Sequence, residues 1–502
     1  MSDTTHLVSL DRYTLDQLDA LASGGASLGL SADVRATIDA GAACVQRVVE
    51  RGESVYGVTT GFGALSEHRI APDDISELQR RHVLSHACGV GPFADEHTAR
   101  LVLLAKLLTL RSGNTGVRSS TVDRLIALWN AGTIPAIPMQ GTVGASGDLA
   151  PLAHMALPLL GLGHVHARGR VVPTREVVSA DPLTLVAKEG LALTNGVQFI
   201  TAIAIDAVVR AKRLARTADL VAAISVQGFS GAADFFHPRY HATSPHAERA
   251  IVARNLRTLL EGSNHHALPT AVASRQDPYS FRCIPQVHGA IRQTIAHAER
   301  VVEDEVNGVS DNPLFFPDED LVLCGGALHG ESIAFVLDYL AIAIAELASI
   351  SERRTYQLLS GQRGLPDFLA PRPGLDSGFM VAQYTSAALV NHNKVLATPA
   401  SVDTIPTSQL KEDHVSMGGT SALKLLQVID NATTVIAIEL MTAAQAVERV
   451  PHLVSSVRLA EVQRAFRERV PSLVEDRVLA DDIAISKRFV LDELPRWIGE
   501  LS

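Results

Sequence analysis

The chain has 502 residues, of which 47% are apolar and 20% are charged, a composition typical of a globular protein with a large core. Its formal net charge of −10 and its pI near 6.0 argue against nucleic acid or an acidic membrane surface as a partner. This length fits two to four average domains or one large helical domain.

The cysteines and the apolar runs indicate a reducing compartment and no membrane anchor. The four cysteines lie far apart in the sequence and form no CxxC pair: Cys44, Cys88, Cys283 and Cys324. The first six residues lack a basic start followed by an apolar core, so no secretory signal is expected. The most apolar run, Ile333 to Ile350, contains Asp338 and Glu346 and predicts a buried helix rather than a membrane span. We therefore expect a cytoplasmic protein.

Helical periodicity dominates the chain from residue 95 onwards. Apolar residues recur at three- and four-residue spacing over 97–111, 120–131, 192–227, 286–308, 329–360, 378–395 and 414–448. Strand is expected in only a few segments, such as Arg168 to Val172. The pattern predicts one mainly α domain over residues 1–502, with an N-terminal part to about residue 195, a central bundle to about 450 and C-terminal helices over 451–502.

Some of these helices are apolar on more than one face, including Val197 to Ile224 and Val435 to Ala446. A helix that is apolar all round must be covered on every side. In a chain of this size, the excess of apolar helix predicts a helical bundle that is shared between subunits.

The first segment whose residues could take part in catalysis is Tyr56-Gly57-Val58-Thr59-Thr60-Gly61-Phe62-Gly63. Its glycines predict a tight or mobile loop that presents the Tyr56 hydroxyl. A free tyrosine has a pKa of about 10, so Tyr56 would need a lowered pKa, from helix dipoles or nearby cations, to act as a base. The alternative is a half-buried loop tyrosine with a hydrogen-bonded hydroxyl. No GK[ST] follows, so the loop does not match a phosphate-binding loop.

Residues 141–154 contain the most informative motif, Ala145-Ser146-Gly147. The Gly147 amide nitrogen can attack the Ala145 carbonyl carbon and close a five-membered ring, because only glycine leaves that amide unhindered. Loss of two waters, one carrying the Ser146 hydroxyl, leaves 4-methylideneimidazol-5-one, a strong electrophile made from backbone. The alternative is an ordinary loop in which Asp148 caps a helix that has Pro151 in its first turn. The two are compatible, and the positive end of such a helix would sharpen the electrophile.

Taken with the other motifs, residues 141–154 resemble the signature of the aromatic amino acid ammonia-lyases and 2,3-aminomutases. The resemblance extends from about residue 10 to 485 and is nearest to the histidine ammonia-lyases. It implies a long-helix bundle of the fumarase/aspartase-like type, with a smaller N-terminal region that carries the ring-forming loop. It also implies a homotetramer whose active sites draw residues from three chains, with an autocatalytic ring from Ala145, Ser146 and Gly147 and no external cofactor.

The same resemblance assigns roles around the ring. Tyr56 would be the base. In Gln276-Asp277-Pro278-Tyr279-Ser280-Phe281-Arg282, a helical spacing places Tyr279 and Arg282 on one face. Arg282 would hold the substrate carboxylate with its bidentate fork, and Tyr279 would handle a proton. A surface ion pair beside a core tyrosine is the alternative for this pair.

Three amides complete the expected site. Asn195 would lie at the ring oxygen and the substrate carboxylate, with Gln198 in support, although Asn195 could instead cap the helix that follows it. Asn312, in Ser310-Asp311-Asn312-Pro313, would lie near the carboxylate or would simply form a turn.

Two residues bear on the substrate. The Ser85-His86 pair resembles the corresponding pair in histidine lyases and some tyrosine aminomutases. His86 would then hydrogen-bond the polar end of the substrate ring. Glu412 resembles the acid that histidine lyases place near the imidazole. A carboxylate there suits a cationic or N–H-donating ring. His82 and His86 also have the spacing of a two-histidine metal site, but no third ligand is evident and no metal is expected.

Three departures from the histidine lyase pattern leave the outcome of the reaction open. Ala327 and Leu328 replace an Asn-Phe pair, so Leu328 would lie beside the ring in place of an aromatic side chain. Lys411 replaces a glutamine and His392 a glutamate. We expect either a lyase that converts L-histidine to trans-urocanate and ammonia, or an aminomutase that makes the β-amino acid from L-histidine or L-tyrosine. A catalytically inactive binding protein is disfavoured because Ser146, Tyr56 and Arg282 are all present.

Overall fold

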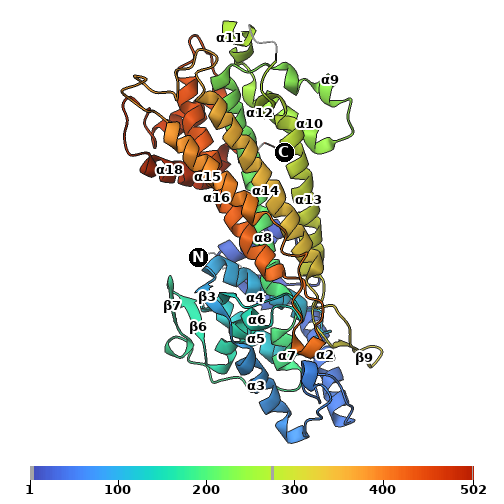
Figure 1. Cartoon of the computed structure of the whole chain (residues 1–502). Coiled ribbons are helices and arrows are strands. Elements are labelled where there is room, and N and C mark those ends of the chain that lie inside the picture. The colour runs from blue at the N-terminus through green and yellow to red at the C-terminus, as the bar shows by residue number, and fades with distance from the viewer. Residues whose placement is uncertain (1–4, 273–275, 500, 502) are drawn as a thin grey trace. The chain divides into compact units, whose positions relative to one another are not determined.

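The computed structural model describes residues 5–272, 276–499 and 501. Most of these residues are helical, which confirms the mainly α class (Figure 1). The chain divides into two compact units, each assembled from three separate stretches of sequence. The first unit contains Met1–Val209, Ala298–Asp338 and Pro399–Leu423. The second contains Arg210–His297, Tyr339–Thr398 and Lys424–Ser502.

Four long helices carry residues of both units: α8 (Gln198–Phe229), α13 (Ile284–Asn307), α14 (Glu331–Leu358) and α16 (Gly418–Val447). The first unit also contains α1 (Leu15–Ser23), α2 (Ala32–Glu50), α3 (Ile75–His86), α4 (Glu96–Leu110), α5 (Ser119–Asn130), α6 (Leu149–Ala156) and α7 (Glu189–Thr194). The second contains α9 (Pro238–His241), α10 (Ala247–Leu260), α11 (Pro269–Val272), α12 (Tyr279–Arg282), α15 (Met380–Leu396), α17 (Val457–Arg467), α18 (Leu479–Arg488) and α19 (Pro495–Ile498).

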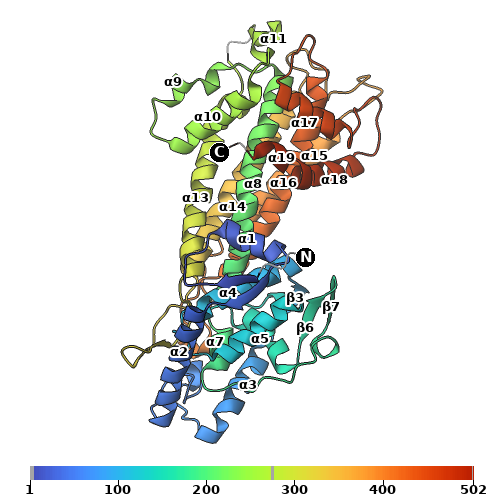
Figure 2. The same ribbon diagram turned by 180° about the vertical axis from the view of Figure 1, so that it is seen from behind.

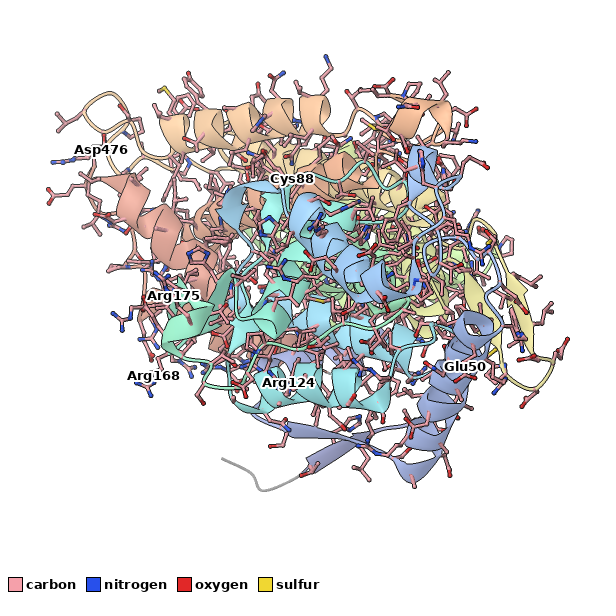
Figure 3. All side chains as sticks on the ribbon, turned by 90° about the horizontal axis from the view of Figure 1, so that it is seen from below. Glu50, Cys88, Arg124, Arg168, Arg175 and Asp476 are labelled. Atoms are coloured by element: carbon pink, nitrogen blue, oxygen red, sulfur yellow. The ribbon has the colours of Figure 1, made fainter. Side chains whose placement is uncertain are left out.

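Short strands are confined, among the described residues, to the first unit. β1 (Thr5–Val8) pairs in parallel with β2 (Ser27–Leu30), and β3 (Val90–Phe93) pairs antiparallel with β5 (Pro138–Gln140). β4 (Ile134–Pro135), β6 (His164–Ala167) and β7 (Arg170–Pro173) form a three-stranded sheet, and β8 (Leu314–Phe316) pairs with β9 (Leu321–Leu323). The exposed side chains of Arg168 and Arg175 point outward at the rim of the β6–β7 region (Figure 3).

The periodicity located most helices to within three residues, but it was wrong at one important place. The expected helix over 192–227 is interrupted after α7, and α8 begins only at Gln198. Asn195 has extended backbone angles and Gly196 has a φ of +104°. A Cβ on Gly196 would lie 2.1 Å from the Ser310 carbonyl oxygen, so the chain needs glycine at this break. The strand expected from Arg168 starts at Arg170, because Arg168 and Gly169 form the tip of the β6–β7 hairpin with positive φ.

The second unit is built around a buried polar cluster formed by Ser225 of α8, Ser351 and Arg354 of α14, and Glu439 of α16. These helices run side by side in both ribbon views (Figures 1 and 2). Arg354 donates from Nε and Nη2 to the two Glu439 oxygens over 2.5 and 2.8 Å, and each serine hydroxyl donates over 2.6 Å. All four members are fully buried. The cluster therefore fixes the positions of α8, α14 and α16 relative to one another along their helix axes.

By length and composition, α14 and α16 are apolar enough to cross a membrane. In the structure, 67% of the apolar stretch of α14 and 78% of that of α16 are buried. Both helices therefore behave as core helices, as expected for the run from Ile333 to Ile350. All four cysteines have free thiols. Residues 1–4, which were part of the argument against a secretory signal, lie outside the described residues.

Candidate active site

The ring-forming loop lies between β5 and α6 and already has an unusual backbone. Ser146 has a φ of +53° and Gly147 a φ of +75°. Residues other than glycine rarely adopt the positive φ of Ser146, and backbone strain of this kind is often found at functional sites. A Cβ on Gly147 would lie 2.0 Å from the Gly196 carbonyl oxygen, so only glycine fits there. The structure thus gives Ser146 and Gly147 a tight turn that only glycine can complete at position 147.

The break between α7 and α8 pairs with this loop. Gly147 and Gly196 form a parallel bridge, in which the Asp148 amide donates to the Gly196 carbonyl oxygen over 2.7 Å. In return, the Gly196 amide donates to the Ser146 carbonyl oxygen over 3.3 Å. The helix break that the periodicity did not predict is therefore part of the site, because its backbone holds the ring-forming loop.

Asp148 has a different role from the expected cap of α6, since its side chain makes no capping hydrogen bond to that helix. Its carboxylate accepts instead from the Ile200 amide in the first turn of α8 over 2.9 Å and from the Thr142 hydroxyl over 2.8 Å. Burial raises the pKa of Asp148 to about 6, against the opposing effect of these donors. Asp148 therefore ties the ring-forming loop to the start of α8.

Asn195 lies at the C-terminal end of α7, so the alternative reading, in which it caps the following helix, is wrong. Its side chain is 3% exposed, and its Oδ1 has no hydrogen-bond partner among the described residues. Gln198 is also buried, and its Nε2 donates to the Thr109 hydroxyl over 2.9 Å and to the Ser310 carbonyl over 3.2 Å. Buried polar atoms are rarely left unpaired, so the Asn195 oxygen is a candidate for contact with a ligand.

Tyr56 follows α2 on the glycine loop, and its hydroxyl accepts a hydrogen bond of 2.9 Å from the Gly63 amide. Burial raises the pKa of Tyr56, and the charge of Glu412 adds to this effect, whereas the Gly63 amide opposes it. The expectation that helix dipoles or cations of the protein lower this pKa is therefore wrong for the isolated chain. A positive charge added beside Tyr56 would lower this pKa and favour the phenolate that a base at neutral pH requires.

The two histidines of α3 lie one turn apart, with ring centroids separated by 3.9 Å. His82 is buried, and its Nε2 lies 2.8 Å from the Thr194 hydroxyl. The Nδ1 of His86 lies 2.8 Å from the His82 carbonyl oxygen, which can only accept, so this nitrogen carries the proton. Burial lowers the pKa of His86, which favours the neutral ring. The Nε2 of neutral His86 is therefore an acceptor.

Glu412 approaches the loop from the segment before α16. One carboxylate oxygen contacts the Ser146 hydroxyl, and the other accepts from the Thr407 hydroxyl over 2.5 Å. The Thr407 hydroxyl thus fixes the orientation of the carboxylate beside the loop.

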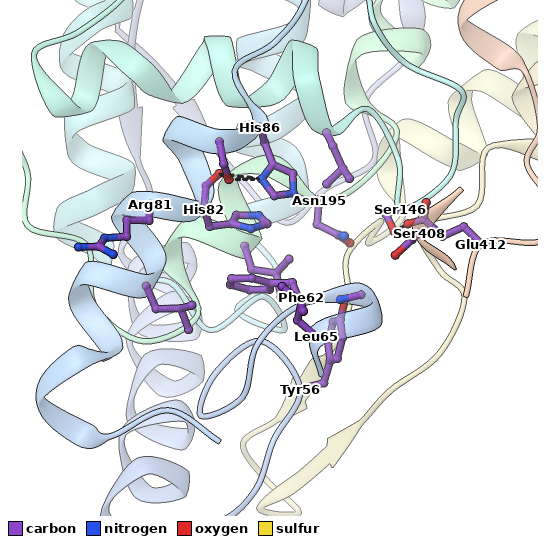
Figure 4. Close-up of a pocket in the computed structure, with 15 residues that line it drawn as sticks. Tyr56, Phe62, Leu65, Arg81, His82, His86, Ser146, Asn195, Ser408 and Glu412 are labelled. Atoms are coloured by element: carbon purple, nitrogen blue, oxygen red, sulfur yellow. Dashed lines mark hydrogen bonds between the residues drawn. The ribbon is translucent and has the colours of Figure 1, made fainter. Parts of the chain in front are cut away.

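These side chains border a single cavity of about 400 Å³ within the first unit (Figure 4). Figure 4 shows His82 and His86 from α3 on one side, Ser146, Ser408 and Glu412 on the other, and Tyr56 on a separate loop. The residues that were expected and that line the cavity are Tyr56, His86, Ser146, Asn195 and Glu412. Those that lie outside the sequence motifs include Leu65, Leu78, Arg81 and Ser408.

The remaining expected residues lie elsewhere. Asn312 accepts from the Gly325 amide over 2.8 Å, and Leu328 is half-buried in the segment before α14. Tyr279 and Arg282 belong to the second unit, where α12 places them on one face as expected. The Arg282 guanidinium lies 4.1 Å from the centre of the Tyr279 ring, and Tyr279 is 69% exposed rather than a core residue. Arg282, the expected carboxylate clamp, is half-buried beside the exposed Tyr279 ring.

Comparison with known proteins supports the resemblance seen in the motifs. Residues 13–468 match the family described as aromatic amino acid lyase. A histidine ammonia-lyase from Symbiobacterium thermophilum is 47% identical over 94% of this chain and 93% of its own. The crystal structure of histidine ammonia-lyase from Trypanosoma cruzi superposes with a TM-score of 0.90 at 38% identity, covering 99% of this chain and 98% of that one. Tyrosine aminomutase from Streptomyces globisporus gives a TM-score of 0.94 at 34% identity, with 99% of each chain covered. With a family match over almost the whole chain and a cavity built on the ring-forming loop, the chain belongs to the aromatic amino acid lyase family.

Proposed function

We propose that the protein is a histidine ammonia-lyase, which eliminates ammonia from L-histidine to give trans-urocanate. The observation that carries this proposal is the placement of His86 and Glu412 at the cavity. With the His86 proton assigned to Nδ1 from its contact with the His82 carbonyl oxygen, Nε2 of His86 and the Glu412 carboxylate both accept hydrogen bonds. An imidazole N–H or an imidazolium satisfies such acceptors, whereas a phenyl ring leaves them unpaired. Curated relatives that match nearly the whole chain include histidine ammonia-lyases at 46–47% identity.

The ring-forming loop fits the prosthetic group that the family implies. The tight turn at Ser146, the space that only Gly147 can occupy and the small Ala145 side chain are what closure of a 4-methylideneimidazol-5-one ring requires. The ring supplies an electrophilic carbon, which the side chains of the protein do not provide. No external cofactor is proposed.

Tyr56 is proposed to remove the proton from Cβ of the substrate. Its raised pKa favours the neutral phenol in the free chain. The cationic ammonium of the substrate, when it enters the cavity, acts in the opposite direction and favours the phenolate. Tyr56 thus becomes basic when substrate is present, which limits unproductive proton transfer in the empty site.

The amides and the second unit are proposed to hold the substrate carboxylate. Asn195, with Gln198 in support, offers a buried oxygen to the ring or the substrate. Asn312 and Leu328 keep their expected roles near the carboxylate and beside the ring only as part of this proposal. Arg282 and Tyr279 are proposed to reach the cavity from a neighbouring copy in a homotetramer, with Arg282 binding the carboxylate and Tyr279 handling a proton. We expect this assembly to work in the cytoplasm.

The test is to incubate purified protein separately with L-histidine and L-tyrosine, and to quantify ammonia and products by chromatography with mass detection. The intact mass of the protein should be lower than the sequence mass by two waters. Urocanate formed with one equivalent of ammonia is the expected result. A product isomeric with its substrate and free of released ammonia would establish an aminomutase instead, and an unchanged protein mass would overturn the proposed ring.

A further inference from the structure

A fully buried lysine lies in the middle of α4. Lys106 is 0% exposed, and its neighbours in the helix from Leu101 to Leu110 are buried as well. A cation in such surroundings is costly unless polar groups compensate for the lost water. The Lys106 ammonium therefore needs polar partners inside the core.

The Lys106 ammonium binds the end of α7. Its Nζ donates to the Ala192 carbonyl oxygen over 3.0 Å and to the Asn195 carbonyl oxygen over 2.7 Å. The carbonyls at the end of a helix lack partners within the helix, and a cation is favoured there. Lys106 thus stabilises the break between α7 and α8 from inside the core.

One peptide group connects this cation with the ring-forming loop. The Asn195 carbonyl, which accepts from Lys106, and the Gly196 amide, which donates to the Ser146 carbonyl oxygen over 3.3 Å, belong to the same peptide unit. Hydrogen bonds arranged in series through one peptide group polarise and strengthen each other. A cation on the acceptor side therefore makes the Gly196 amide a stronger donor.

The Ser146 carbonyl oxygen is the atom where this donor matters. On ring closure it becomes the carbonyl oxygen of the imidazolone, conjugated with the methylidene that forms from the Ser146 side chain. A stronger donor at that oxygen withdraws electron density from the methylidene carbon. Preorganised donors of this kind are the usual means of electrostatic activation in enzymes.

We propose that Lys106 is a positioning residue that activates the electrophile through the Asn195–Gly196 peptide. This inference rests on the proposed ring. Lys106 touches neither substrate nor ring, and its contribution is to orient and polarise the amide that does.

The charges around Lys106 allow it to be cationic near neutral pH. Burial, together with the charge of Lys188, lowers the pKa of Lys106 to about 7 against the opposing effect of Asp311 and Asp148. Lys188 is itself paired with Asp311 over 2.7 Å. Since the lysine loses its proton as pH rises through about 7, the activation should weaken over the same range.

The test compares Lys106→Met, which removes the charge, with Lys106→Arg, which keeps a cation. Glu305→Gln is the matched control, because Glu305 is a half-buried ionisable group whose pKa is raised to about 7 by burial and by the charge of Asp148. For each protein we would record the intact mass, the near-ultraviolet absorption of the ring, the rate at which cyanide bleaches it at one fixed pH, and kcat and KM for L-histidine.

We expect Lys106→Met to show the full loss of two waters but to bleach about tenfold more slowly than the parent protein, with a similar fall in kcat and little change in KM. Lys106→Arg should recover much of the rate, and Glu305→Gln should match the parent. Bleaching of matured Lys106→Met at the parental rate would overturn the proposal, because a purely structural lysine would not slow it. A parent protein without the two-water loss would instead refute the ring itself.

If Lys106→Met fails to fold or to mature, titration of the ring absorption in the Glu305→Gln protein decides the question. A shift of the absorption between about pH 6 and about pH 8.5 supports a titrating cation coupled to the ring. An absorption that stays constant over this range overturns the proposal.

Discussion

Both units bury polar side chains, but the Glu439 cluster of the second unit and the cavity region of the first differ in how many hydrogen bonds these side chains make. In the polar cluster of the second unit, both Glu439 oxygens accept one bond from Arg354 and one from a serine. Around the cavity of the first unit, the Asn195 Oδ1 and the Gln198 Oε1 are buried without a partner among the described residues. Saturated groups hold helices in register, whereas unsaturated ones retain the capacity to bind something else. The difference separates the Glu439 cluster, whose groups hold helices together, from the cavity region, whose groups remain available to a ligand.

The largest effect should come from Ser146→Ala, which removes the hydroxyl that ring formation expels. Turnover should fall by at least about 1,000-fold, because the electrophile is not replaced by any side chain. The variant should keep the full sequence mass and the helical content of the parent protein. Residual turnover within tenfold of the parent would show that the reaction does not use the ring.

In the second unit, Glu439→Gln should damage stability rather than chemistry. Removing one partner of a buried ion pair leaves Arg354 as an uncompensated cation and should lower the free energy of unfolding by about 3–5 kcal/mol. Urea unfolding would measure this loss, and the folded fraction should keep the parental kcat. The matched double variant Glu439→Met with Arg354→Met should recover most of the stability, and a single-variant loss below about 1 kcal/mol would contradict the assigned role.

In contrast to Glu439→Gln, Asn195→Ala should reduce turnover without reducing stability. We expect kcat to fall by about 100-fold, as is typical when one stabilising polar group of an active site is lost. The free energy of unfolding should stay the same or rise by about 1 kcal/mol, because a buried unpaired oxygen has been removed. Parallel assays of turnover and urea unfolding would check both, and a variant that loses both activity and stability would remove the distinction between the two regions.

The smallest effect concerns acid sensitivity of the second unit. Burial lowers the pKa of His265 to about 4, and its Nε2 has no partner among the described residues. Because the unfolded chain binds this proton more readily, the stability contributed by neutral His265 is present above about pH 6.5 and declines as pH falls toward 4, by about 2 kcal/mol at pH 5. His265→Gln should lose less stability than the parent between pH 7 and pH 5, as measured by urea unfolding, and equal losses would refute the assignment.

The long helices were predictable because their apolar spacing is determined by the core they face. The same signal failed at Asn195 to Val197, since the apolar pattern continues through the break and only Gly196 marks it. Asp148 was expected to cap α6 because the local sequence allows it, whereas its actual partner, the Ile200 amide, lies far along the chain. Local rules cannot rank a nearby partner against a distant one.

The residues of the candidate site show the same limit of prediction from sequence. Tyr56, Ser146 and Glu412 carry motifs, and the structure brings them to one cavity. Lys106 carries none, because a single lysine within an apolar helix gives no indication of the carbonyls that it meets. The direction of the Tyr56 pKa was also missed, since it depends on burial, which a sequence does not report.

The bridge between Gly147 and Gly196 bears on attempts to transplant this chemistry into designed proteins. The Ala-Ser-Gly tripeptide is not a portable unit, because its turn is held by a second segment about fifty residues away in the sequence. A scaffold intended to host the electrophile would need both segments at hydrogen-bonding distance, with a glycine in each. Grafting the loop alone should yield an inert turn.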